Sequence, residues 1–317
     1  MKEYGGFIGL DTYRLPMLHE GAVALNCGRN CLAYLIRSKN IKKIFLPYYM
    51  CNSIFNVCKK YDVEVKCYHV DETLLPPDIE LADDEWIYVA NYYGQLTKQH
   101  ILDLKAKYDG RIVIDNAQAY FDVPVEGVDT FYTCRKYFGV ADGAFLYTDK
   151  LSDEEYPLDE SFDRMRFLLG RYERTASEFY SDYKENNRLF VNEPIKRMSK
   201  LTCNLLHGID YEYVKQRRTD NFTAFHTAFG SINKLKLTIA EGALAYPLLI
   251  ENGTEVRKAL QEKKIYVPAY WPAVLERVSD DSSDRYIVNN ILPLPCDQRY
   301  GAEDTEYIAQ CINEIIA

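Results

Sequence analysis

The stretch that decides the fold is Arg111-Ile112-Val113-Ile114-Asp115-Asn116-Ala117-Gln118-Ala119. An apolar run of the β type ends in an acid, Asp115, and an amide, Gln118, follows three residues later. In open α/β sheets ligands bind beyond the carboxyl ends of the strands, so this pattern places Asp115 where a cofactor would lie. A second interpretation stays open, because an acid that follows a strand can also be the N-cap of the next helix.

Short runs of the same kind recur on both sides of this stretch. Between residues 28 and 149 they alternate with segments of helical periodicity, which is the pattern of a mostly parallel α/β sheet. Apolar residues at positions 54, 57, 58 and 61, and again at 101, 104 and 108, give the intervening helices one apolar stripe each. We therefore expect a doubly wound sheet with strands at 44–46, 63–70, 86–90, 112–114, 130–133 and 144–148.

The chain changes character after residue 150. Residues 151–205 are polar and helical in pattern, and a longer helix is predicted over 211–229, where Gly230 ends it. The remaining residues predict a smaller α+β unit. Its elements are two proline-rich strands, at 266–272 and 292–295, and a final helix with an apolar stripe of Ile308, Cys311, Ile312 and Ile315.

Composition excludes several classes of function. The 317 residues contain 38 Lys and Arg against 47 Asp and Glu, a net charge of -9, which disfavours binding to nucleic acid or to an anionic membrane surface. Nine scattered cysteines predict buried thiols in a reducing compartment, hence a cytoplasmic protein. Cys27 and Cys31 have no second Cys or His pair of matching spacing, so no metal site is expected. No signal peptide or membrane span is expected either.

A glycine turn opens an amphipathic helix at Cys27-Gly28-Arg29-Asn30-Cys31. Free backbone N–H groups at a helix start attract anions, so a phosphate could lie on Gly28, Arg29 and Asn30. A simple capping role for these residues is the alternative. The chain contains no dinucleotide fingerprint and no P-loop motif, so nicotinamide and nucleoside-triphosphate chemistry are not indicated.

One lysine follows a predicted strand in Thr133-Cys134-Arg135-Lys136. An Asp142-Gly143 turn comes later in the same loop and leads into the next strand. A lysine in such a loop can form a Schiff base with a carbonyl cofactor. The alternative is an ordinary surface lysine.

Taken together, these segments resemble the DegT/DnrJ/EryC1/StrS family of pyridoxal-phosphate-dependent sugar aminotransferases, and the resemblance runs over most of the chain. The family has fold type I, with a mostly parallel large domain and a smaller C-terminal α+β domain. The matching segments are residues 28–30 at the family's Gly-Thr phosphate turn, 46–53 at its Pro-x-x-Thr-aromatic segment, 89–94 at its Pro-Val-His-x-x-Gly strand, 115–118 at its Asp-x-Ala-(Gln/His) element, and Lys136 at its Schiff-base lysine.

The resemblance implies a role for each matching residue. Lys136 would bind the cofactor and move the proton, and Asp115 would keep the pyridine nitrogen protonated; these two are the expected catalytic residues. Gln118 would contact the ring or its hydroxyl. The phosphate would lie on Gly28, Arg29, Asn30 and Thr133.

Other positions depart from the family or are assigned to the substrate. Cys51 stands where most members have an aromatic that stacks on the ring, so the thiol or Tyr93 is expected to cover the cofactor, with Tyr49 and Tyr92 as further candidates. Tyr49 and Arg299 are expected to bind substrate. Arg299 offers a bidentate fork for an anion, although a salt bridge to Asp297 or Glu303 is its alternative.

The resemblance implies transfer of an amino group from an amino acid donor to a keto-sugar nucleotide, in surface polysaccharide or related sugar biosynthesis. A homodimer is expected, with the loops at 48–49 and 92–93 contributing to its interface. The expected division is a cofactor-binding large domain over 1–205 and a connector helix with a small domain over 206–317.

Two alternatives stay open: a related protein without transaminase activity that has a regulatory or scaffolding role, and a pyridoxal-phosphate-dependent sugar dehydratase. The family's Gly-Tyr-Asn-Tyr-Arg-Met segment contains an Asn that reaches the neighbouring subunit. It has no clear counterpart among Asn186, Asn187 and Asn192, and this keeps the first alternative open.

Overall fold

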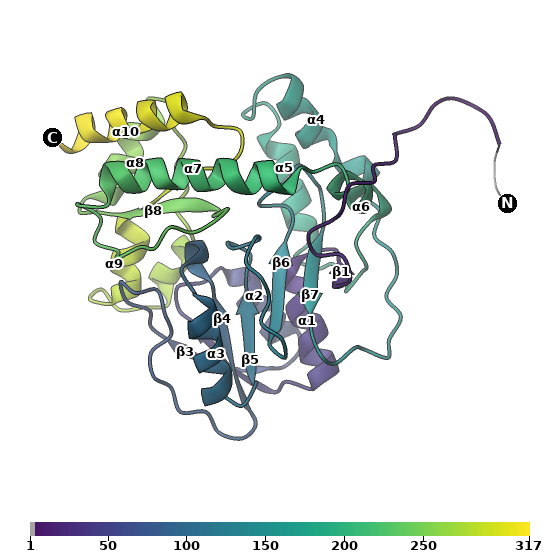
Figure 1. Ribbon diagram of the computed structural model, residues 1–317. Coiled ribbons are helices and arrows are strands. Elements are labelled where there is room, and N and C mark those ends of the chain that lie inside the picture. The colour runs from purple at the N-terminus through teal and green to yellow at the C-terminus, as the bar shows by residue number, and fades with distance from the viewer. Residues whose placement is uncertain (1–3) are drawn as a thin grey trace.

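A seven-stranded sheet forms the centre of the molecule in the computed structural model, which describes residues 4–317. The strand order is β1-β7-β6-β5-β4-β2-β3 (Figure 1). The four ladders from β3 to β6 are parallel, and those of β6 with β7 and β7 with β1 are antiparallel. The expected mostly parallel sheet is confirmed. Its strands are β1 (Val23–Leu25), β2 (Lys43–Pro47), β3 (Glu64–Tyr68), β4 (Glu85–Ala90), β5 (Ile112–Asp115), β6 (Asp129–Thr133) and β7 (Ala144–Tyr147).

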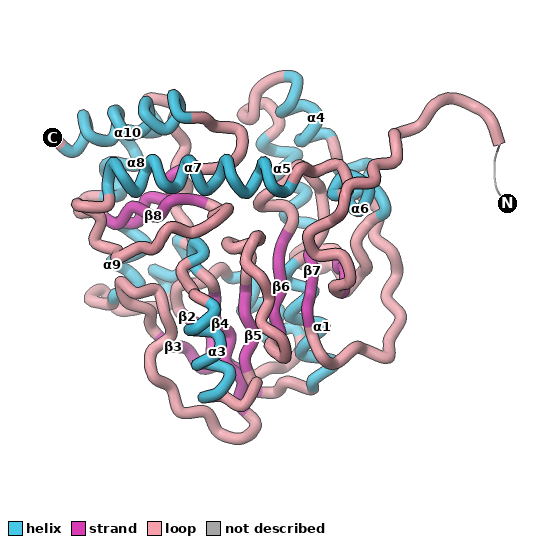
Figure 2. Tube along the Cα trace, in the orientation of Figure 1, coloured by secondary structure: helices cyan, strands magenta, loops and turns pink. Residues whose placement is uncertain are grey.

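The central strands are apolar because both faces of the sheet are covered. Ile112, Val113 and Ile114 of β5 have no exposed surface. α-Helices occupy the connections from β1 to β2, from β2 to β3 and from β4 to β5, as Figure 2 shows in cyan, while β3 and β4, and β5 and β6, are connected without a helix. Within the first half of the chain these helices are α1 (Gly28–Lys39), α2 (Asn52–Lys60) and α3 (Lys98–Lys107), with the short turn η1 (Tyr92–Gly94) after β4.

A helical region follows β7 and leads into the longest helix. It contains η2 (Phe162–Arg164), α4 (Arg166–Glu173), α5 (Tyr180–Leu189) and α6 (Lys200–Leu206), and then α7 (Tyr211–Phe229). The predicted helix over 211–229 is confirmed, with Gly230 as its C-cap. In Figure 1, α7 runs above the sheet from the region of α5 to that of β8.

A second, two-stranded sheet lies in the C-terminal part. Its antiparallel strands are β8 (Ala245–Leu249) and β9 (Ile291–Pro295), and it is surrounded by α8 (Gly253–Glu262), η3 (Pro272–Glu276), α9 (Ser283–Asn290) and α10 (Ala302–Ile316). The predicted stripe of the final helix is confirmed, because Ile308, Cys311 and Ile312 are buried with Phe222, Phe225 and Phe229 of α7, and Ile315 is partly buried against them.

The structure differs from the predicted elements in the C-terminal part and at one edge of the large sheet. Residues 266–272 form no ladder, so the prediction of a strand there is wrong. Pro268 and Pro272 cannot donate a backbone hydrogen bond, and β9 instead pairs with β8, where Pro247 lies opposite Pro293. The short edge strand β1 is not predicted, because its three residues carry no periodicity. Within residues 4–317 no helix is both long and apolar enough to cross a membrane.

Candidate active site

Asp115 is the last residue of β5 and lies between two parallel neighbours, β4 and β6. The residue is only 9% exposed. Its Oδ1 accepts a hydrogen bond from the amide of Ala117 at 2.8 Å, and its Oδ2 accepts one from the hydroxyl of Tyr88 at 2.5 Å. A turn rather than a helix follows β5, so the interpretation of Asp115 as a helix N-cap is wrong.

Lys136 lies in the turn after β6, the strand that pairs with β5, and it is exposed. Burial raises the pKa of the Asp115 carboxyl, while the ammonium of Lys136 and the hydrogen bonds from Tyr88 and Ala117 act in the opposite direction. The positive charge of Lys136 therefore favours the ionised form of Asp115. Lys136 makes no hydrogen bond or ion pair with any described residue, so its amine is free to meet a ligand.

The backbone next to Lys136 is held by the C-terminal part of the chain. The carbonyl of Tyr137 accepts hydrogen bonds from Nε2 of Gln298 at 2.8 Å and from Nη2 of Arg218 at 3.4 Å. The Arg218 guanidinium also lies 4.4 Å from the centroid of the Tyr137 ring. These contacts join α7 and the residues after β9 to the lysine turn.

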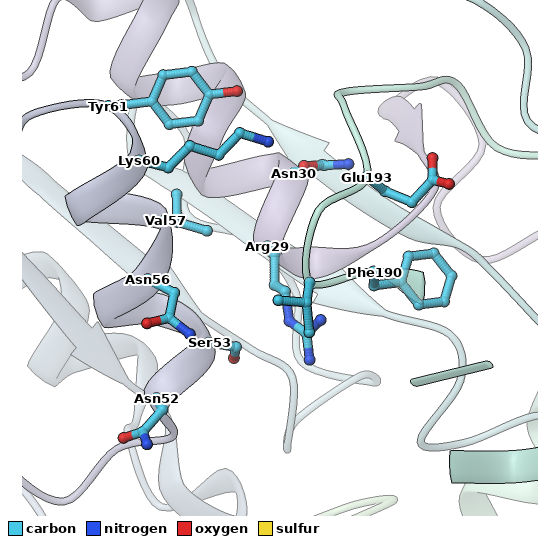
Figure 3. Close-up of a pocket in the computed structure, with 11 residues that line it drawn as sticks. Arg29, Asn30, Asn52, Ser53, Asn56, Val57, Lys60, Tyr61, Phe190 and Glu193 are labelled. Atoms are coloured by element: carbon cyan, nitrogen blue, oxygen red, sulfur yellow. The ribbon is translucent and has the colours of Figure 1, made fainter. Parts of the chain in front are cut away.

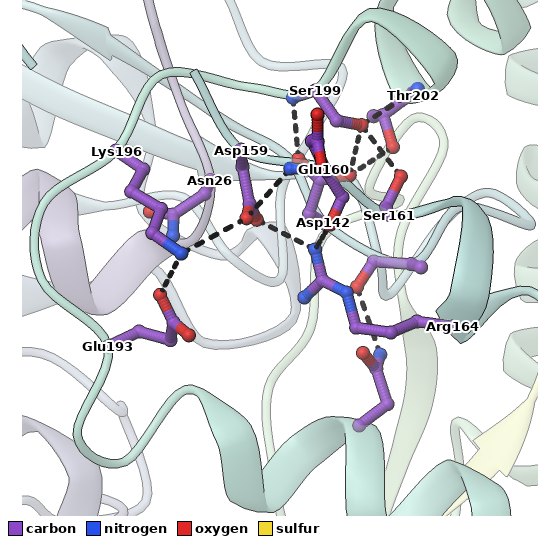
Figure 4. Close-up of polar contacts among 12 residues, drawn as sticks. Asn26, Asp142, Asp159, Glu160, Ser161, Arg164, Glu193, Lys196, Ser199 and Thr202 are labelled. Atoms are coloured by element: carbon purple, nitrogen blue, oxygen red, sulfur yellow. Dashed lines mark hydrogen bonds and ion pairs between the residues drawn. The ribbon is translucent and has the colours of Figure 1, made fainter. Parts of the chain in front are cut away.

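The Asp142-Gly143 turn fixes the other end of the lysine loop (Figure 4). Asp142 is fully buried and accepts hydrogen bonds from the amide and hydroxyl of Ser199, at 2.8 and 2.7 Å, and from the hydroxyl of Thr202. Gly143 has a φ of +114°, and a Cβ there would lie 3.0 Å from Cγ2 of Thr202. The turn therefore requires glycine and connects the loop to the start of α6.

The start of α1 packs directly on β6. A Cβ at Gly28 would lie 3.3 Å from the Phe131 ring and 3.9 Å from Cβ of Thr133, which places the helix start beside Thr133. The N-cap residue, Cys27, makes no side-chain capping bond, and the first turn contains no acid. The first amides of α1 are therefore available to an anion.

Asn30, in contrast, is already engaged. Its amide donates to the carbonyl of Cys27 at 3.0 Å, and its Nδ2 donates to Oδ1 of Asn26 at 2.8 Å and to the carbonyl of Pro194 at 2.7 Å. Asn30 has no free donor left, so the structure does not support the expectation that it binds a phosphate.

A cavity of about 230 Å³ lies between α1, α2 and the segment that follows α5 (Figure 3). Asp115 and Lys136 are not among its lining residues. The cavity is instead lined by Arg29, Asn30, Asn52, Ser53, Asn56, Val57, Lys60, Tyr61, Phe190, Val191 and Glu193.

The tyrosines expected near the cofactor lie in an aromatic cluster. Tyr49 and Tyr93 have no exposed surface; the Tyr49 ring lies 4.7 Å from that of Trp271, and the Tyr93 ring lies 6.4 Å from that of Tyr270. The carbonyl of the Gln118 side chain accepts the Tyr93 amide at 3.0 Å. Contacts of Tyr49 with substrate and of Tyr93 with the cofactor stay predictions.

Cys51 and Arg299 have partners within the chain. Cys51 is partly exposed at the start of α2, and its Sγ lies 2.8 Å from the hydroxyl of Ser53. Arg299 forms a bidentate salt bridge with Asp297, at 2.6 and 2.8 Å, and half of its side chain is exposed. This salt bridge is the alternative named for Arg299, and its contact with substrate stays a prediction.

Sequence reasoning missed Tyr88, Arg218 and Gln298. A tyrosine inside a buried strand has the pattern of a packing residue, and the other two act through backbone carbonyls far away in the sequence.

The fold is that of sugar aminotransferases, as comparison with solved structures shows. No family model and no curated protein sequence matches the chain. A DegT DnrJ EryC1 StrS aminotransferase from Brucella abortus is similar over 93% of this chain and 86% of its own, with a TM-score of 0.63 and 14% identity. The expected fold class, a fold-type-I transferase with a mostly parallel large sheet, is confirmed.

Two further solved structures are similar to this chain. DesV from S. venezuelae, in complex with a ketimine intermediate, has a TM-score of 0.66 and 14% identity over 95% of this chain and 90% of its own. The putative sugar aminotransferase Spr1654 from Streptococcus pneumoniae, in its PLP form, has a TM-score of 0.63 and 13% identity over 94% and 88%.

Proposed function

We propose that this chain is a pyridoxal-phosphate-dependent aminotransferase that moves an amino group from an amino acid donor to a keto-sugar nucleotide. The observation that carries the proposal is that a buried carboxylate, Asp115, and a lysine without a hydrogen bond or ion pair to any described residue, Lys136, follow two neighbouring strands of the sheet. Similarity to sugar aminotransferases, one of them in a PLP form, supports the choice of cofactor and substrate class.

The residues present fit pyridoxal phosphate. Its pyridinium nitrogen requires an anionic acceptor, and Asp115 is a buried carboxylate with one protein donor on each oxygen, which leaves a lone pair for a further hydrogen bond. Its phosphate requires donors, and the uncapped start of α1 at Gly28 and Arg29 supplies amides beside Thr133. Its carbonyl carbon requires an amine, and Lys136 has one without a protein partner.

The cofactor, when bound, supplies an electron sink for the carbon that loses or gains the amino group. Asp115 would hold a proton at the ring nitrogen by a charge-assisted hydrogen bond. Lys136 would bind the carbonyl carbon through its amine and then move a proton as general base and acid. Gln118, whose NH₂ group makes no hydrogen bond with the described residues, would orient the ring.

The experiment that tests this function measures the first half of the reaction. Loaded with pyridoxal phosphate and given glutamate but no acceptor, wild-type protein should release about one equivalent of 2-oxoglutarate per chain. Asp115→Asn should release it at least ~100-fold more slowly, because an amide cannot balance the charge of the ring nitrogen. Asp103→Asn, at an exposed position of α3, is the matched control. Equal rates in the two variants, or no release by wild type, would contradict the proposal.

We also place the protein in the cytoplasm and assign it to surface polysaccharide or related sugar biosynthesis, with no nucleic-acid or membrane partner.

We divide the chain at residue 205 into a large domain and a smaller C-terminal part. Buried Ile287 and Val288 of α9 pack into the core of the large sheet, so the two parts share a hydrophobic contact.

We also propose a homodimer. Of the tyrosines first expected at its interface, Tyr49, Tyr92 and Tyr93 are at most 2% exposed in the single chain and Tyr48 is partly exposed, so the contribution of these loops stays a prediction. Large apolar side chains are exposed around α4, where Phe162, Leu169 and Tyr172 are 73%, 62% and 93% exposed, and we propose this surface as part of the interface.

A further inference from the structure

A second cavity, of about 810 Å³, lies at the amino ends of the parallel strands. Trp86, the second residue of β4, lines it, and so does Arg111, which directly precedes β5. Asp115 is the last residue of β5, so four residues of extended strand, about 13 Å, separate it from Arg111. The other lining residues come from the end of α1, the end of α3, the turn before β6 and the segment after β7. The cavity therefore lies at the opposite end of the sheet from the proposed active site.

One side of this cavity is apolar. The Trp86 side chain is only partly buried, although β4 is a central strand of the sheet. Leu102 and Ala106, one turn apart on α3, also line the cavity and are exposed. A partly exposed indole offers a flat ring a surface to stack on, and this kind of stacking accepts different aromatic rings. The cavity is therefore suited to an aromatic ligand.

Three cations line the cavity and form no ion pair in the described part of the chain: Lys105, Arg111 and Lys150. Arg111 donates through Nη1 alone, to the carbonyl oxygens of Ala82 and Glu85. Its Nε and Nη2 have no partner among the described residues, and these two donors form the fork that can bind two oxygens of one phosphate. The Arg111 guanidinium is therefore anchored at one nitrogen and available at the other two.

The ammonium of Lys105 is held in place by the backbone of the turn before β6. Its Nζ donates to the carbonyl oxygen of Glu126 at 2.7 Å. Gly127 has a φ of +70°, and a Cβ there would lie 2.8 Å from Nζ of Lys105, so this position of the ammonium requires glycine. An ammonium has three donors, and two of those on Lys105 remain for a ligand.

The acids at the cavity leave these three cations unpaired. Asp129 and Asp149 both pair with Lys39 at the end of α1, the first at 2.8 Å. Asp109 lines the cavity and makes no hydrogen bond or ion pair through its side chain with any residue in 4–317. An ionised carboxylate only accepts hydrogen bonds, so Asp109 suits a hydroxyl or amino group of a ligand.

We propose that this cavity binds a nucleoside monophosphate, at a site separate from the active site. The base would stack on Trp86. The phosphate would lie on the Arg111 fork and on the ammonium groups of Lys105 and Lys150, and Asp109 would accept from a ribose hydroxyl. The volume is within the range of small-molecule sites, and inorganic phosphate alone would leave the apolar side uncovered. The proposal does not rest on the proposed function, because none of these residues takes part in it.

The test titrates adenosine monophosphate into the full-length protein and measures its binding by calorimetry. Loss of a charge-assisted hydrogen bond should weaken binding about 10- to 100-fold in Lys105→Met and in Arg111→Met. Lys107→Met is the matched control, because Lys107 lies on the same helix as Lys105 and pairs with Asp78 away from the cavity. It should bind as wild type does. Adenosine, which lacks the phosphate, should bind wild type at least ~10-fold more weakly.

Tryptophan fluorescence locates the bound base. The chain contains two tryptophans, Trp86 and Trp271. A base stacked on Trp86 should quench the fluorescence of wild type and of Trp271→Phe, but not that of Trp86→Phe. Quenching that persists in Trp86→Phe and is lost in Trp271→Phe would place the nucleotide in the aromatic cluster of Tyr49 and would overturn the proposal.

The proposal is also overturned if wild type binds no adenosine monophosphate, if it binds adenosine equally well, or if folded Lys105→Met and Arg111→Met retain the full affinity. These outcomes are separable from those of the proposed function. Nucleotide binding that depends on Lys105, in a protein that never attaches pyridoxal phosphate to Lys136, would support this site and contradict the aminotransferase.

Discussion

Asp115 carries the buried negative charge on which the proposed chemistry depends. Burial alone favours a protonated carboxyl, which could not hold a proton at a ring nitrogen. Three features of the chain favour the ionised form: the Lys136 ammonium, the Tyr88 hydroxyl and the Ala117 amide. These groups around one strand end would keep the carboxylate ionised for its proposed role.

Tyr88→Phe tests this balance. The variant removes the hydroxyl that donates to Oδ2 of Asp115, so the pKa of Asp115 should rise further. The ionised carboxylate is required, so activity should be lost on acidification at a pH about one to two units higher than in wild type. The measurement is the pH dependence of kcat/KM and of cofactor absorbance.

Tyr68→Phe is the control for that profile. The Tyr68 hydroxyl is also buried, but it donates to the backbone carbonyl of Tyr88 and not to a carboxylate. Its acid limb should coincide with that of wild type. An unshifted limb in Tyr88→Phe would mean that the hydroxyl has no electrostatic effect on Asp115.

At the scale of elements, the large sheet was predictable from the sequence and part of the C-terminal unit was not. Parallel strands such as β5 are buried on both faces, so they form short apolar runs that separate clearly from the helical stripes. The strand β8 lies in a longer apolar stretch and has a proline at its centre, so its sequence pattern does not distinguish it from a loop. The segment is a strand because it pairs with β9, and this pairing is a tertiary contact that the local sequence does not show.

The candidate site follows the same division. Asp115 and Lys136 could be proposed from the sequence because the ends of strands are local features, and the family resemblance then implied their roles. The hydrogen bonds of Asn30 to Asn26 and Pro194 could not be predicted from the sequence. They depend on the segment before α6 lying beside the end of β1, which is a tertiary contact. The support of the lysine turn by Arg218 and Gln298 also comes from distant parts of the chain.

At the scale of the whole molecule, the exposed apolar side chains around α4 predict self-association. An obligate interface buries on the order of 2,000 Å² or more, and isolated exposed aromatics such as Tyr172 become favourable within it. Tyr172→Glu should therefore convert a homodimer into monomers in sedimentation velocity, because the charge would be buried without a partner. Tyr307→Glu, at an exposed aromatic of α10, should leave the dimer intact. A wild-type protein that stays monomeric at every concentration would contradict the homodimer.

The central claim is that Lys136 is the lysine that binds pyridoxal phosphate, and covalent trapping tests it most directly. The protein is incubated with pyridoxal phosphate, reduced with borohydride, digested and analysed by mass spectrometry. The account predicts a pyridoxyl group on the peptide that contains Lys136, its loss in Lys136→Arg, and its retention in Lys150→Arg, which changes an exposed lysine after β7. Labelling of a different lysine, or of none, would contradict the account.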